Sequence, residues 1–197
     1  QGYSSAASDV YKRQSAHLLQ AALIKVLGDE VKQAGSQVEE NRMRFDFTFS
    51  RAMTPQEVKK TEDIMNKWIG EKLPVNTDVM GIEEAKLTGA TALFGEKYED
   101  VVRVVSIGGK AKCNCGSDCS CDHESGEEKE VISKEFCAGT HASNTADLRL
   151  VKIVSEGAIA AGTRRIEAVV ADAAIDYLNA KSAEIAVSYT HLRAHET

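Results

Sequence analysis

The sequence predicts an α+β fold: a mostly antiparallel sheet with helices packed on one side. Helix-like and strand-like segments interleave along the 197 residues without the regular repeat of a parallel α/β protein. The clearest strand has Met43, Phe45 and Phe47 alternating with polar residues, as a strand with one buried face does. A chain of this length can bury a full core within one domain.

The remaining elements follow from periodicity and from punctuating residues. A helix is expected over residues 15–27, where an apolar stripe ends at Gly28. A second begins at the capping box Thr54-Pro55-Gln56-Glu57 and runs to about Leu73, before Pro74. A short helix is expected at residues 83–88 and a last one from about 171. The other expected strands are 75–80, 101–107, 131–136, 148–154 and 165–170, whereas 33–36 has the composition of a turn.

The two ends of the chain show no clear hydrophobic periodicity that continues into the adjacent residues. Residues 1–14 and 188–197 resemble translated adapter sequence, so we expect them to be non-native tails. The expected domain then covers residues 15–170 and carries a Cys-rich acidic insert at 110–130. His191 and His195 lie four residues apart but have no weight as a site within such a tail.

Composition restricts the partners that the chain can have. The formal charge of −6 argues against a broad nucleic-acid surface such as a DNA-binding face, although much of this charge lies in the insert. No apolar run is long enough to span a bilayer and no secretory signal is visible, so we expect a cytoplasmic protein without a membrane partner.

The segment from Cys137 to His141 has the spacing of a metal-binding turn. Gly139 between them gives the backbone freedom that both side chains need to reach one ion. His17, on the first expected helix, is a third candidate ligand. One helical turn earlier stands Arg13, which cannot bind zinc. Taken alone, His17 is also typical of a boundary histidine and Cys137 of a small buried residue.

Four of the five cysteines lie within nine residues of the insert. They are Cys113, Cys115, Cys119 and Cys121, with His123 close behind. Such a group can chelate a second zinc or another soft metal. Three alternatives stay open: a polar surface loop with reduced cysteines, a redox- or metal-sensing loop, and a loop that docks a partner.

Together these motifs resemble the editing domain of alanyl-tRNA synthetase, and they are similar to free-standing alanyl-tRNA editing proteins and the threonyl-tRNA synthetase editing domain. The family has HxxxH-Leu-Leu, of which residues 15–20 match the second half, and Cys-Gly-Gly-Thr-His, matched at 137–141 except for Ala138. Further segments follow the family in order: 33–36, 44–47, 92–98, 101–105 and 162–168. Residues 171–187 resemble the start of the link to the synthetase's C-terminal domain, which favours a synthetase fragment.

The resemblance implies hydrolysis of the ester that joins serine or glycine to alanine tRNA, with zinc as cofactor held by His17, Cys137 and His141. Its other implied partner is the rest of the synthetase chain. Gln33 and Thr140 would act on substrate or water. Arg164 and Arg165 would contact the acceptor end of the tRNA. Gln33 is equally typical of a solvated glutamine in a turn. Arg164 and Arg165 are equally typical of exposed charged residues on a strand. A free-standing editor and a non-catalytic metal- or tRNA-binding module remain alternatives.

Overall fold

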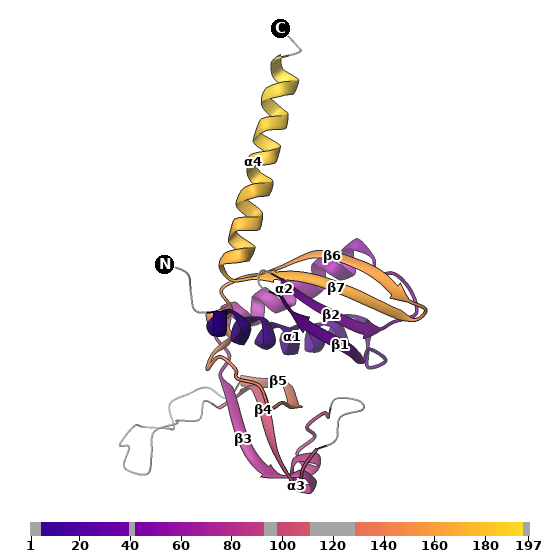
Figure 1. Ribbon diagram of the computed structural model, residues 1–197, viewed down its shortest axis with the longest axis vertical. Helices are drawn as coiled ribbons and strands as arrows, with labels where there is room; N and C mark the ends of the chain where they lie inside the picture. The colour runs from indigo at the N-terminus through magenta and orange to yellow at the C-terminus, as the bar shows by residue number, and fades with distance from the viewer. Residues whose placement is uncertain (1–4, 40–41, 93–97, 111–128, 195–197) are drawn as a thin grey trace, which may run out of the picture.

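The computed structural model describes residues 5–39, 42–92, 98–110 and 129–194, and its strands form two antiparallel sheets (Figure 1). The four-stranded sheet has the order β1 (Gln33–Val38), β2 (Met43–Thr48), β7 (Thr163–Val170), β6 (Val151–Ala160). The three-stranded sheet has the order β3 (Val75–Gly81), β4 (Val101–Gly109), β5 (Lys129–Phe136). The predicted α+β class is confirmed. Its division into two sheets was not predicted.

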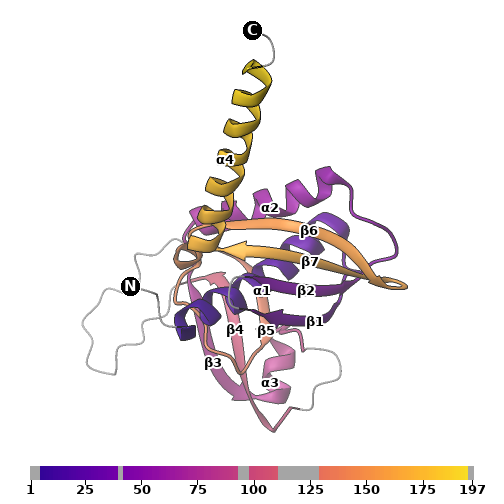
Figure 2. The ribbon, with the colours of Figure 1, turned by 45° about the horizontal axis from the view of Figure 1, so that its top comes forward.

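Two helices, α1 (Ser5–Leu27) and α2 (Pro55–Gly70), cover one face of the four-stranded sheet (Figure 2). Alternation along β2 turns Phe45 and Phe47 toward these helices, where both are fully buried beside Leu19 of α1 and Met65 of α2. The predicted capping box is present at the start of α2, with the Thr54 side chain accepting from the Glu57 backbone N–H. This half contains the main apolar core.

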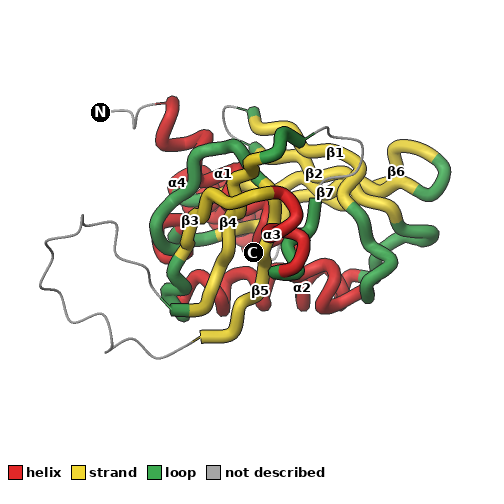
Figure 3. Tube along the Cα trace, turned by 90° about the horizontal axis from the view of Figure 1, so that it is seen from below, coloured by secondary structure: helices red, strands yellow, loops and turns green. Residues whose placement is uncertain are grey.

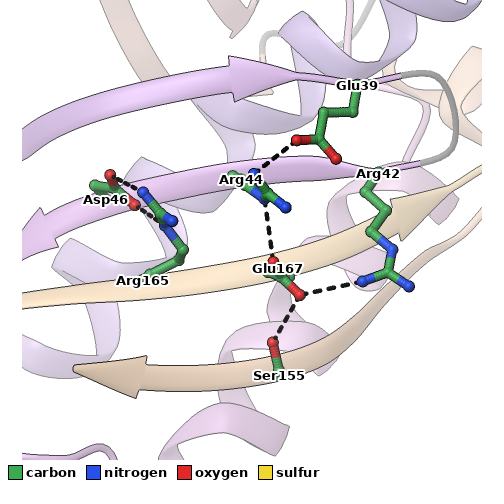
Figure 4. Close-up of polar contacts among 7 residues, drawn as sticks. All are labelled: Glu39, Arg42, Arg44, Asp46, Ser155, Arg165 and Glu167. Atoms are coloured by element: carbon green, nitrogen blue, oxygen red, sulfur yellow. Dashed lines mark hydrogen bonds and ion pairs between the residues drawn. The ribbon is translucent and has the colours of Figure 1, made fainter. Parts of the chain in front are cut away.

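The opposite face of the four-stranded sheet carries paired charges (Figure 4). Arg165 on β7 donates to both carboxylate oxygens of Asp46 on β2, at 2.7 and 2.8 Å. Glu167 on β7 accepts from Arg44, Arg42 and Ser155. Because β2 and β7 alternate inward apolar and outward charged residues, one face builds the core while the other stays polar.

The smaller sheet packs against α3 (Ile82–Leu87), which lies beside β3 and β4 in Figure 3. Its own buried apolar residues are few among the described ones: Ala85, Val102, Val104 and Phe136. The far end of β4 reaches the main core through fully buried Ile107. β5 runs antiparallel to β4 and ends directly before Cys137, so this sheet delivers the predicted metal-binding turn.

Several predicted boundaries were wrong, among them the end of the second helix, at Gly70 and not Leu73, and the end of β6, at Ala160 and not residue 154. Residues 33–36, predicted as a turn, form most of β1, because their backbone pairs with β2 at the sheet edge despite a polar, glycine-containing sequence. The first helix begins at Ser5, not near residue 15. Leu148 ends the short 3-10 helix η1 (Thr145–Leu148), so β6 starts only at Val151.

The last helix, α4 (Asp172–Ala194), projects away from the body of the protein (Figure 1). It begins one residue after the predicted start and continues through residue 188 without interruption. Ala174 is buried at its base, whereas Ile175, Leu178 and Ile185 are exposed. Within the described residues, no helix combines the length and apolar character needed to cross a membrane.

Candidate metal centre

The three predicted zinc ligands come together at the junction of the two sheets. His17 lies on α1, Cys137 follows β5, and His141 lies four residues beyond Cys137. One potential ligand atom from each lies within 4.8 Å of the others. Nε2 of His141 is 3.1 Å from Sγ of Cys137, and the two imidazole ring centres are 4.8 Å apart. This convergence of a helix and a distant turn matches the metal group expected from the motifs.

Both histidines are held through the ring nitrogen that faces away from the thiol. Nδ1 of His17 is 2.5 Å from Oε2 of Glu135, and Nδ1 of His141 is 2.9 Å from Oε1 of Gln14. Ser133 donates to the other oxygen of Glu135 at 2.8 Å. An acceptor on Nδ1 keeps a proton on that nitrogen, so once Nε2 releases its proton, the Nε2 lone pair can face a metal. Both Nε2 atoms are therefore available on the side of Cys137.

The electrostatics of this group favour a thiolate. Burial acts to raise the pKa of Cys137, but hydrogen bonds from His141 and His17 outweigh it and lower the pKa to about 5. Burial acts to lower the pKa of His17, yet hydrogen bonds with Cys137 and Glu135 raise it to about 10. A proton on His17 thus balances nearby negative charge, and a bound cation would supply the same balance.

The donor set fits zinc. One thiolate and two imidazoles are ligands that zinc prefers, and three protein ligands leave one position for water or substrate, as in catalytic sites. The neighbourhood of Arg13 explains why the set stops at three. A Cβ added at Gly139 would collide with the Arg13 side chain, so Arg13 lies against the metal-binding turn. Position 13 therefore faces the site, but its guanidinium offers no lone pair to a metal.

Two cavities border the centre. A cavity of about 390 Å³ reaches Cys137 and Gly139 and is also lined by Arg13, Tyr98 and Arg103. A cavity of about 660 Å³ is lined by Ser133 and Glu135 of β5 together with Gln33 and Gln20. Both volumes are in the range of small-molecule sites.

The structure places the other predicted site residues at different distances from this centre. Gln33 lines the larger cavity and hydrogen-bonds Ser36, and Thr140 is exposed within the metal-binding turn. Arg164 pairs with both oxygens of Glu156, and Arg165 with both oxygens of Asp46 (Figure 4 shows the second pair). Neither arginine lines the two cavities. The cysteines of the insert lie outside the described residues.

Sequence reasoning missed the residues that hold the ligands in place. Ser133 and Glu135 lie two residues apart on β5, so both side chains point to one face of the sheet, and Cys137 follows two residues later, just past the end of the strand. This Ser-x-Glu-x-Cys alternation was a readable signal. Gln14 was missed because it was assigned to a non-native tail.

The sequence is similar to known tRNA synthetases. Residues 102–167 match the threonyl and alanyl tRNA synthetase second additional domain. The chain is 46% identical over 169 residues to alanine–tRNA ligase of Synechococcus sp., covering 86% of this chain and 17% of the relative. It is 44% identical over 184 residues to alanine–tRNA ligase 1 of Lachnoclostridium phytofermentans, covering 90% and 18%. It is 44% identical over 169 residues to the chloroplastic/mitochondrial alanine–tRNA ligase of Populus trichocarpa, covering 86% and 15%.

The matched domain defines the class: a second additional domain of threonyl and alanyl tRNA synthetases. Over 86–90% of its length the chain matches a segment of alanine–tRNA ligases, as its motifs indicated. It spans less than a fifth of the length of the curated relatives, 17%, 18% and 15% in the three cases.

Proposed function

We propose that this domain hydrolyses the ester bond of alanine tRNA mischarged with serine or glycine. The observation that carries the proposal is the His17, Cys137 and His141 group, of which Cys137 lines a cavity of about 390 Å³. A pocket that activates alanine cannot exclude smaller glycine or near-isosteric serine strongly by binding alone, so a second hydrolytic site is needed. Zinc is the cofactor that the donor set fits.

A zinc ion in this site would supply Lewis acidity toward an ester carbonyl or a water molecule. The chain's own residues supply the rest. The Cys137 thiolate and the two Nε2 atoms would hold the ion, and Glu135 keeps His17 oriented. Thr140 is exposed in the same turn and can hydrogen-bond substrate or water. Gln33, across the larger cavity, can hydrogen-bond the amino acid or the terminal nucleoside.

The partners of the domain are the acceptor end of alanine tRNA and the rest of the synthetase chain. Arg164 and Arg165 are the proposed tRNA contacts. Their bidentate carboxylate pairs mean that phosphate would have to compete with Glu156 and Asp46 for the guanidinium groups. We therefore expect these contacts to add less affinity than unpaired arginines would.

The test uses the chain with Arg13→His, which restores a fourth ligand, and measures release of serine, glycine and alanine from alanine tRNA. We expect release of serine and glycine but not alanine, and loss of release on Cys137→Ala or His141→Ala. Both variants should retain the fold, measured by circular dichroism. A zinc-loaded chain that binds the tRNA yet releases neither serine nor glycine would contradict the proposal and favour a non-catalytic tRNA-binding module.

A further inference from the structure

The His17 side chain is held by a carboxylate that is not among the three candidate ligands. Oε2 of Glu135 lies 2.5 Å from Nδ1 of His17, and each side chain is only 10% exposed. Nδ1 is therefore engaged, and Nε2 is the nitrogen left to face Cys137. A metal-binding histidine depends on such an outer acceptor, because it sets both the tautomer and the ring orientation.

Glu135 is itself held by the strand that carries it. Ser133 donates to Oε1 of Glu135 at 2.8 Å, so each carboxylate oxygen has its own partner. In the register of the sheet, Ser133 pairs with Ile107 and Glu135 with Val105, both buried residues of β4. The same strand ends directly before Cys137. β5 therefore positions one ligand directly and a second ligand, on α1, through a carboxylate.

We propose that Glu135, fixed by Ser133, is the positioning residue for His17. It accepts the Nδ1–H hydrogen bond, turns the Nε2 lone pair toward the metal, and makes the imidazole a stronger donor. This inference rests on the metal centre of the proposed function, but it does not depend on which ester the site hydrolyses.

The test is zinc affinity, measured by competition with a chelator on the full chain. Glu135→Ala is expected to weaken binding about 10-fold to 100-fold, the usual effect of losing an outer partner. Glu135→Gln keeps a hydrogen-bond acceptor of the same length without the charge, so its loss of zinc affinity should be smaller. Ser133→Ala should give the smallest loss of zinc affinity. Glu62→Gln is the matched control: Glu62 is a half-buried carboxylate that binds Lys152 and the Ile153 N–H on the other sheet. It should lower stability without changing zinc affinity.

Two further readouts separate positioning from general damage to the fold. In a His17→Ala background, Glu135→Ala should cause no additional loss of zinc affinity, because the residue acts only through His17. With Co²⁺ as the probe, Glu135→Gln should change the visible absorption spectrum, whereas Glu62→Gln should not.

Unchanged zinc affinity in Glu135→Gln and Glu135→Ala, or an equal loss with and without His17, would overturn the proposal. If Glu135→Ala fails to fold, the Glu135→Gln result decides alone. Absence of deacylation combined with a Glu135-dependent zinc affinity would overturn the proposed function and leave this inference standing.

Discussion

The two sheets of this protein differ in how much apolar packing supports them. The four-stranded sheet lies under α1 and α2 and buries Phe45 and Phe47 completely. The three-stranded sheet has only the short α3 and a small cluster of its own around Phe136 within the described residues. His17 belongs to the first region, whereas Cys137 follows the last strand of the second. A metal bound between them would therefore tie the weakly packed sheet to the strongly packed one.

This difference suggests that overall stability and metal binding depend on different regions. Core side chains of the large sheet set the free energy of unfolding, because they remove the most apolar surface from water. Side chains of the small sheet place the metal-binding turn. Substitutions in the large sheet should therefore change mainly the free energy of unfolding, and substitutions in the small sheet mainly the zinc affinity.

The largest expected effect is on stability from the large sheet. Phe45→Ala removes a fully buried ring between β2 and the helices and should lower the free energy of unfolding by about 3–5 kcal/mol. Urea unfolding without metal measures this value. In variants that remain folded at low temperature, zinc affinity should change little. Among the described residues, the ring contact of Phe45 is with Phe47 and not with any of the three candidate ligands.

Phe136→Ala should show the reverse order. Phe136 packs edge-on against Tyr98, with ring centres 5.1 Å apart, and directly precedes Cys137. Its removal should cost about 3 kcal/mol, the lower end of the range for a buried phenylalanine, since a small cluster can collapse around the lost ring more easily than a large core. Zinc affinity should fall more than in Phe45→Ala. Equal changes of zinc affinity in the two variants would show that the regions are not separable in this way.

The next effect is a gain of zinc affinity at position 13 of α1, one helical turn before His17. Arg13→His places an imidazole one turn before His17, against the metal-binding turn, and removes a positive charge. We expect zinc to bind at least about tenfold more tightly, which is about 1.4 kcal/mol, and the melting temperature in excess zinc to rise accordingly. Arg13→Gln is the control, because it removes the charge without adding a nitrogen ligand. If both substitutions raise affinity equally, charge alone explains the gain.

The same comparison shows what the sequence could and could not predict. Alternation along β2 and the capping box at Thr54 are local patterns, and both were predicted correctly. The three candidate ligands were predicted from motif spacing and resemblance, and the structure brings them together. By contrast, β1 and the Glu135–His17 contact depend on partners distant in sequence. A polar edge strand has little local signal, and a glutamate's hydrogen-bond partner is set by tertiary packing.

A smaller effect is expected at the start of α2, on the large sheet. The Thr54 side chain accepts from the Glu57 N–H at 3.2 Å, and the Glu57 carboxylate accepts from the Thr54 N–H at 2.8 Å. Thr54→Ala removes one of these two caps and should lower stability by about 1 kcal/mol, measured by urea unfolding. Thr54→Ser keeps the hydroxyl and should stay close to the original value. Zinc affinity should be unchanged in both, since α2 supplies none of the candidate ligands among the described residues.

The smallest expected effect is the loss of stability at acid pH that comes from Glu57 in the cap of α2. The pKa of Glu57 is lowered from its ordinary 4.5 to about 2, first by the hydrogen bond with Arg51 and then by that with the Thr54 backbone. A lowered pKa means that the stabilisation is fully present above 4.5 and is lost as the pH falls toward 2. Glu57→Gln should therefore lose less stability than the original chain between pH 5 and pH 3, in urea unfolding without metal. Both chains contain the same His17 and Cys137, so acid effects at the metal centre cancel in the difference. Glu84→Gln, at an exposed position of α3, is the control and should lose as much stability over this pH range as the original chain. If stability falls equally with pH in Glu57→Gln and Glu84→Gln, the acid sensitivity does not come from Glu57.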